Sequence, residues 1–203
     1  MHNRKLIKIR QEKENISNFD QKIFFKDYQN DFVERVSLIN EEFENSLAFG
    51  FRGSKLEFSK NVKNVIYGNL GKSNKTNIIY DEELIPFKES SLDLIMSFFN
   101  LHFANDVPGI LYQTLRSLKP NGLFIASMFC ENTLQELNYS FIKAEEEICG
   151  GMSPRVSPFA KLQALASLMQ EINFSLPVAD IDRHSVYYKP VSYTHLRAHE
   201  TVV

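Results

Sequence analysis

Residues 81–129 read DEELIPFKESSLDLIMSFFNLHFANDVPGILYQTLRSLKPNGLFIASMF and decide the fold. The segment 91–99 is a short apolar run with a single charge, which is typical of a strand covered on both faces of a parallel sheet. Asn105-Asp106 then offers a helix N-cap, and Pro108 falls in the first turn, where a proline costs no hydrogen bond. Apolar side chains recur at helical spacing from there to Leu118.

The helix should end at residues 119–122, because Lys-Pro-Asn-Gly combines a proline with a glycine. The apolar run 123–129 is then the next buried strand. A strand, a helix and a second parallel strand form one crossover unit, for which a right-handed connection is the default.

Before this unit, apolar residues at helical spacing over 16–43 predict one or two helices, and the polar segment 1–18 is expected to be loose. Three earlier strands are expected: one at 46–54 with its glycine turn, one at 63–70 and one at 77–80. The segment 71–75 predicts a loop, so almost no helix is expected between the second and third strands.

After the unit, Thr133 and Glu136 form a capping-box pattern that should begin a helix, and Gly150-Gly151 should close it. Ser157-Pro158 is expected to cap a further helix with an apolar inner face. Residues 178–188 predict two strands or one bent hairpin.

The composition is that of an ordinary globular chain of 203 residues, with 43% hydrophobic and 24% charged residues. A net charge of −2 argues against a nucleic-acid binder that works by bulk electrostatics. Cys130 and Cys149 lack metal-ligand spacing and a disulfide framework, which favours a reducing interior. No apolar run has the length of a membrane span, so we expect no integral membrane segment. We expect no metal site either, because His195 and His199 lack a third ligand.

Several pieces resemble the second half of class I S-adenosylmethionine-dependent methyltransferases of the type 11 kind: Ile85-Pro86-Phe87, Leu92–Ile95, Leu101-His102-Phe103 and Leu118–Gly122. Three further pieces are similar to one branch of that family, the methyltransferase-like complex I assembly factors and arginine hydroxylases. They are Asp81-Glu82-Glu83, the Leu-His-aromatic group, and GGMSP followed by SPF within 150–159. The resemblance covers residues 19–190.

The resemblance implies an α/β, Rossmann-like class I methyltransferase fold, with a mostly parallel sheet of the seven-stranded type and helices on both faces. The C-terminal part is expected to be truncated or altered, because residues 191–203 depart from the family. The expected organisation is an N-terminal helical segment at 1–45, a methyltransferase-like domain at 46–190 and the tail at 191–203.

The resemblance also implies S-adenosyl-L-methionine as cofactor. Its expected contacts are the turn with Gly50 and Gly53, the second-strand end at Asn69, the acids Asp81 and Glu82, and Asn100. This part departs from the family, with Ala48 at a position for an acid and Ser54 at a position for glycine. Asn69 replaces a carboxylate that would accept bonds from both ribose hydroxyls.

His102 is the candidate catalytic residue, because its free pKa suits proton transfer near neutrality. Each assignment has a plainer alternative. The glycines would form an ordinary turn, the acids after residue 80 a solvated loop, and His102 a structural contact.

Three functions remain open. The first is a methyltransferase acting on a protein substrate, such as a subunit of respiratory complex I under assembly. The second is an arginine hydroxylase on the same fold, and the third is a non-enzymatic scaffold with a degraded cofactor site. We expect no nucleic-acid partner, and a location in the bacterial cytoplasm or, in a eukaryote, the mitochondrial matrix.

Overall fold

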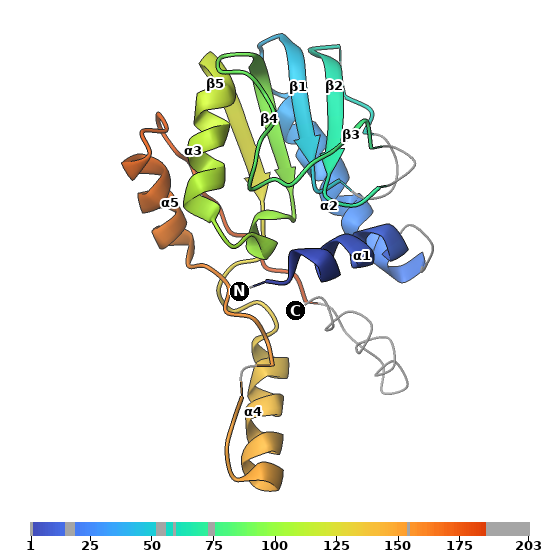
Figure 1. The fold of residues 1–203 in the computed structure, drawn as a ribbon, viewed down its shortest axis with the longest axis vertical. Helices are drawn as coiled ribbons and strands as arrows, with labels where there is room; N and C mark the ends of the chain where they lie inside the picture. Colours follow the sequence, from blue (N-terminus) through green and yellow to red (C-terminus); the bar gives the residue numbers. More distant parts are fainter. Residues whose placement is uncertain are drawn as a thin grey trace. The chain divides into compact units, whose positions relative to one another are not determined.

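A computed structural model of the chain describes residues 2–14, 19–51, 56–58, 60–72, 76–153 and 155–185. The chain divides into two compact units, residues 1–128 and 129–203, and each is described by itself. The first unit holds the sheet and its helices, and the second holds two helices with their connecting segments. Figure 1 shows the order of these elements along the chain.

The described residues of the first unit contain a five-stranded sheet in the order β3-β2-β1-β4-β5, and every neighbouring pair is parallel. The strands are β1 (Phe43–Phe49), β2 (Val62–Asn69), β3 (Ile78–Ile79), β4 (Leu92–Phe98) and β5 (Leu118–Ser127). From β1 the chain builds outward through β2 and β3, and it then returns to place β4 on the other side of β1. The strand order therefore reverses between β1 and β4, and open parallel sheets bind ligands at the carboxyl end of such a point.

Strand β4 forms the centre of the core, as its unbroken apolar run predicts. Leu94, Ile95 and Met96 are 0% exposed, so both faces of the strand are covered. Helix α2 (Phe19–Ser37) covers one face, where Phe32 packs edge-on against Phe98. Helix α3 (Val107–Ser117) packs on β5 with its buried Ile110, and Figure 1 shows it in front of β4 and β5 with α2 behind β1 and β2.

Helix α3 confirms the prediction made for its start. The Asp106 carboxylate accepts a hydrogen bond from the Gly109 amide at 2.9 Å, and Pro108 lies in the first turn. The end of the helix differs, because β5 begins directly at Leu118 and includes residues 119–122. Leu92 pairs with Leu118 but Leu94 pairs with Leu123, so the expected turn is an irregularity inside the strand. Pro120 disfavours a helical conformation at Lys119, and Asn121 within the irregularity has a φ of +66°.

Residues 4–14 are helical, which contradicts the expectation of a loose segment over the part of 1–18 that the structure describes. Residues Arg4–Glu14 form helix α1, and Ile7 is buried. Polar contacts with distant loops hold α1 in place rather than an apolar face. The sequence of α1 therefore lacks a strong helical periodicity of apolar residues. Helix α2 confirms a helix ahead of the first strand, and that strand begins at Phe43 instead of at residue 46.

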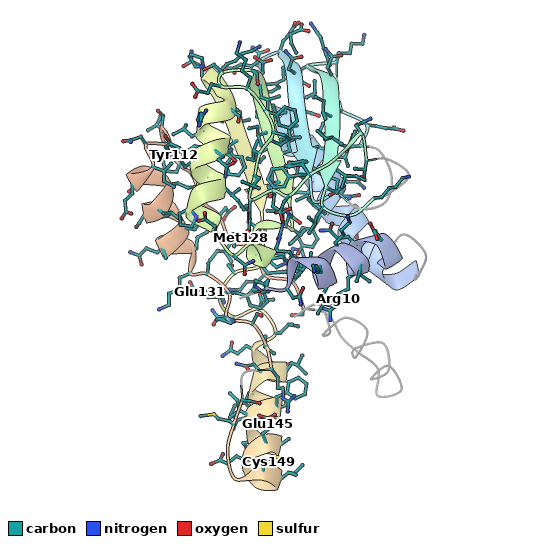
Figure 2. The ribbon with its side chains drawn as sticks, viewed as in Figure 1. Arg10, Tyr112, Met128, Glu131, Glu145 and Cys149 are labelled. Atoms are coloured by element: carbon teal, nitrogen blue, oxygen red, sulfur yellow. The ribbon has the colours of Figure 1, made fainter. Side chains whose placement is uncertain are left out.

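The second unit contains α4 (Gln135–Cys149) and α5 (Leu162–Glu171). The predicted capping box is wrong, because the Thr133 hydroxyl donates to the Cys130 carbonyl within a turn and left-handed Leu134 precedes the helix. Gly150 closes α4 with a φ of +66°, as predicted. Within α4, Glu145 accepts a hydrogen bond from the Ser153 amide at 2.7 Å and pairs with Arg155, which lowers the pKa of the carboxyl. Figure 2 labels Glu145 and Cys149 on this helix.

Helix α5 starts four residues after the expected Ser157-Pro158 cap. Lys161 is its N-cap residue and makes no side-chain capping bond. Neither α4 nor α5 contains a buried residue, so their expected inner faces are at most half-buried. Residues 178–185 form no strand, which contradicts the predicted hairpin over the part of it that the structure describes. The remainder, 186–188, lies outside the described residues.

Candidate cofactor site

Four strand ends meet at the carboxyl edge of the sheet. Gly50 follows β1, Asn69 ends β2, Asp81 follows β3, and Asn100 follows β4. The strands are parallel, so these positions lie along one edge, as the sequence predicted. Gly53 and Ser54 lie outside the described residues, and so do His195 and His199 of the tail.

Gly50 brings the first turn directly against the end of β4. Its φ is +79°, a left-handed conformation that residues with a Cβ rarely adopt. A Cβ at this position would lie 2.2 Å from the Phe98 carbonyl oxygen and 2.8 Å from the Asn100 Cβ. Backbone angle and space therefore both require a glycine here.

Asn69 holds this turn in place. Its Oδ1 accepts a hydrogen bond from the Gly50 amide at 3.0 Å, and its Nδ2 donates to the Phe51 carbonyl at 3.4 Å. An aspartate could accept the first bond but could not donate the second. The asparagine thus serves the chain's own backbone at the position where the family has an acid for the ribose. Sequence reasoning missed this role, because the two bonds join residues 18 and 19 positions apart.

The acids after β3 converge on one guanidinium. Arg4 donates from Nη2 to Asp81 Oδ1 at 2.5 Å and from Nε to Asp81 Oδ2 at 3.3 Å. The same Nη2 lies 2.7 Å from Glu82 Oε1, an ion-pair contact without hydrogen-bond geometry, and Nε lies 4.0 Å from Glu83 Oε1. Burial alone would lower the pKa of Arg4, but the bond to Asp81 and the charge of Glu82 raise it.

Glu82 is 2% exposed, so the acids do not form the solvated loop that was the plainer alternative. Tyr80 is buried beside them, and its ring lies against Gly68, where a Cβ would be 2.1 Å from the ring. Burial, and secondarily the charge of Glu82, raise the pKa of the Tyr80 hydroxyl well above its ordinary value. This part of the edge therefore carries one buried acid, Glu82, beside the partly exposed Asp81 and Glu83, with Arg4 as the cation that the described contacts place on it.

The loop after β4 contains Asn100 and a short 3-10 helix, Leu101–Phe103. Asn100 is buried, and among the described residues its Oδ1 has no hydrogen-bond partner. The half-buried His102 ring lies 4.1 Å from the Phe103 ring, tilted by 49°. The structure thus brings Asn100 to the predicted edge, while the catalytic role of His102 stays a prediction.

Over the described residues, no group of three His, Cys, Asp or Glu side chains could hold a metal ion. In the part of the chain that the structure describes, no helix is long and apolar enough to cross a membrane.

Residues 52–126 match the family model described as a methyltransferase domain. The matched segment is 75 of the 203 residues. The human mitochondrial protein named arginine-hydroxylase NDUFAF5 is 42% identical over 111 residues, which are 55% of this chain and 32% of that protein. A putative methyltransferase of Rickettsia prowazekii is 31% identical over 114 residues, which are 55% of this chain and 50% of that protein. The chain thus spans about a third to a half of these curated relatives.

Solved structures show the same fold. A methyltransferase of Thermotoga maritima, described as SAM-dependent and a possible histamine N-methyltransferase, has a TM-score of 0.52 at 16% identity; 77% of this chain and 76% of that chain are covered. The phosphoethanolamine N-methyltransferase 2 of Haemonchus contortus, solved with S-adenosyl-L-methionine, has a TM-score of 0.52 at 16% identity over 72% of this chain and 36% of that chain. These likenesses confirm the Rossmann-like class I methyltransferase fold.

Proposed function

We propose that this chain is a S-adenosylmethionine-dependent methyltransferase-family protein that acts on a protein substrate in the assembly of respiratory complex I. One observation carries the proposal. Asp81 follows β3 on the same carboxyl edge of the sheet as the Gly50 turn, which follows β1 beside the point where the strand order reverses between β1 and β4.

The residues present fit an adenosyl cofactor at two of its parts. Asp81 can accept from the adenine amino group, and Gly50 keeps the first turn free of a side chain where the methionine end would approach. The unpartnered Oδ1 of Asn100 offers a further buried acceptor, and Glu82 supplies negative charge beside the adenine position. At the end of β2, the position of the expected ribose contact, Asn69 already bonds to Gly50 and Phe51.

The bound cofactor would supply a methyl group on a sulfonium, and the chain would contribute mainly position. Transfer of a methyl group needs an acceptor held in line with that sulfonium, so alignment supplies a large part of the rate. His102, in the loop after β4, is the candidate for orienting or deprotonating the acceptor.

The likeness to the relatives supports the proposed protein substrate and place of action. A complex I subunit is the proposed substrate, because proteins named NDUFAF5 share 40–42% identity with this chain. The same likeness supports the mitochondrial matrix in a eukaryote, and the Rickettsia relative supports the cytoplasm of a bacterium.

Two alternatives have specific support. Arginine hydroxylation is favoured by the likeness to the NDUFAF5 relatives, which are named arginine-hydroxylases. A non-enzymatic scaffold is favoured by Asn69 and Arg4, because each engages a site group with a contact inside the chain. The protein would be incubated with candidate complex I subunits, S-adenosylmethionine, dioxygen and a two-electron reductant. Mass spectrometry of the products would separate an added methyl group, an added oxygen atom and no change.

The test of the proposal is calorimetric titration of S-adenosylmethionine into the full chain, into Asp81→Asn and into Glu89→Gln. Glu89 is an exposed acid paired with Arg116, so it controls for the loss of one negative charge. Because Asp81 also binds Arg4, every protein in this comparison carries Arg4→Gln. A charge-assisted hydrogen bond is worth about 1.5–3 kcal/mol, so Asp81→Asn should then weaken binding at least about tenfold while the Glu89→Gln control binds normally. Absence of binding by the folded chain would contradict the proposal.

A further inference from the structure

Helix α1 is fixed to the loops that follow three of the strands. Beyond β2, Gln11 Oε1 accepts from the Gly71 amide at 2.9 Å and Glu12 Oε1 accepts from the Lys72 amide at 3.3 Å. Packing there is close, since a Cβ on Gly71 would lie 2.9 Å from the Gln11 Cβ. Figure 1 shows α1 beyond the carboxyl ends of the strands.

Beyond β3 and β4, the contacts come from the start of the helix. Arg4 binds Asp81 and Glu82, and its Nη1 donates to the Phe103 carbonyl at 3.3 Å. The His2 backbone exchanges two hydrogen bonds with the Asn105 side chain, at 2.5 and 3.2 Å. The helix therefore crosses the edge at which the cofactor is proposed to bind.

We propose that α1 is a latch on the cofactor site: Arg4 and the adenine ring of the adenosyl cofactor compete for the Asp81 carboxylate, so binding releases α1 from the sheet edge. This inference rests on the proposed function, because it takes Asp81 as the adenine acceptor. It adds a regulatory element that neither the fold nor the family resemblance contains.

The competition follows from the geometry at Asp81. Oδ1 accepts from Arg4 Nη2 at 2.5 Å and from the Glu83 amide at 3.1 Å, and Oδ2 accepts from Arg4 Nε at 3.3 Å. Donors of the chain thus take three of the roughly four acceptor positions of the carboxylate, two of them through Arg4, which leaves little room for an adenine amino group unless Arg4 withdraws. A neutral amino group binds a carboxylate more weakly than a guanidinium does. The other contacts of the cofactor must therefore supply the binding free energy needed to displace Arg4.

The latch can open because its parts are only partly enclosed and α1 has little stability of its own. The Arg4 and Asp81 side chains are 17% and 31% exposed, so water can replace their contact. Eleven residues are fewer than an isolated helix needs in water, so α1 depends on its docking contacts. Glu82 acts in the other direction, because releasing Arg4 would leave its buried charge unpaired. In the closed state, Arg4 occupies Asp81 and the cofactor cannot bind in the proposed way. The apparent affinity for the cofactor therefore equals the affinity of the open state multiplied by the fraction of molecules that are open.

The test is calorimetric titration of S-adenosylhomocysteine into the full-length wild type, Arg4→Gln and Lys5→Gln. This probe has no sulfonium charge, so a change in the local potential does not mimic release of Asp81. Lys5 is the matched control, because it is an exposed cation on the same helix whose side chain makes no described contact. Arg4→Gln should bind at least about fivefold more tightly, since it frees a charge-assisted acceptor, and Lys5→Gln should bind as the wild type does. Unchanged or weaker binding by Arg4→Gln, with the wild type still binding, would overturn the latch and leave the proposed function standing.

Amide hydrogen exchange gives a second readout in the unmutated protein. Saturating S-adenosylhomocysteine should speed exchange of the α1 amides at 8–14 while it slows exchange in β1 and β4. Slower exchange in α1 would overturn the latch, because the helix would then close over the ligand. If none of the folded variants binds the probe, Arg4→Gln included, the proposed function fails and the latch fails with it. Arg4→Lys, which keeps a charge beside Glu82, replaces Arg4→Gln if circular dichroism shows that the latter does not fold.

Discussion

Replacing Gly50 by alanine should be among the most damaging single changes in the sheet. The φ of +79° costs alanine about 1–2 kcal/mol relative to its preferred conformations. The new Cβ would also lie 2.2 Å from the Phe98 carbonyl oxygen, which belongs to the backbone of β4 and cannot rotate away as a side chain could. Forcing such an overlap typically costs a further 1–3 kcal/mol, roughly, which gives an expected total of about 2–5 kcal/mol. A domain with an unfolding free energy of about 5–15 kcal/mol would lose much of its margin.

Gly150→Ala is the matched control for this experiment. Gly150 has a φ of +66°, but no atom lies within 4 Å of the Cβ that alanine would add, so only the conformational cost of about 1–2 kcal/mol remains. The two residues belong to different units, so each loss is read locally by native-state hydrogen exchange, in β4 for Gly50→Ala and in α4 for Gly150→Ala. A loss for Gly50→Ala no larger than that for Gly150→Ala would refute the close-approach argument.

Three further predictions concern buried and partly buried polar groups. Burial alone would raise the pKa of Asp93, but bonds from Lys119 and the Asn45 amide lower it, so its stabilising contribution is present above pH 3.8 and is lost as the pH falls through the lower folded-state pKa. Asp93→Asn should flatten the acid limb of stability measured by urea unfolding, and an unchanged acid limb would contradict this. Ser97→Ala removes a buried hydroxyl without a partner among the described residues and should raise the midpoint of urea unfolding by the equivalent of about 1 kcal/mol; a lower midpoint would count against it. Tyr80 has a raised folded-state pKa, so the unfolded chain loses that proton first and stability should fall above about pH 10. Tyr80→Phe should reduce that alkaline loss, and an equal loss would show that Tyr80 ionises while folded.

The architecture of the first unit could be predicted because its signals are local. The apolar run of β4, the Asp106 cap and Pro108 act within a few residues of their own position, and the structure has each of them in the predicted role. The observed ends of helices and strands differ from the predicted ones where contacts between distant residues determine them. Lys119, for example, precedes Pro120 and has the extended backbone of β5. Its Nζ lies 2.8 Å from Asp93 Oδ1 on the neighbouring strand.

The candidate site was predictable as a set of strand ends but not as a network of contacts. Parallel strands bring Gly50, Asn69, Asp81 and Asn100 to one edge whatever their side chains do. The bonds that Asn69 makes to the glycine turn join residues nearly twenty positions apart in the sequence. The bond between Arg4 and Asp81 joins residues 77 positions apart. No periodicity or motif carries such pairings, and the polar sequence of 1–14 gave no reason to expect a docked helix. The position of Tyr112, in contrast, needs no distant contact to explain it. Helical spacing alone leaves it on the outer face of α3, where it is 60% exposed (Figure 2).

The most direct test of the central claim is a crystal structure of the full chain with S-adenosylhomocysteine. The account predicts the adenine amino group within hydrogen-bond distance of the Asp81 carboxylate, the homocysteine end beside the Gly50 turn, and Arg4 withdrawn from Asp81. A ligand bound away from the carboxyl edge of the sheet would contradict the claim that this edge is the cofactor site.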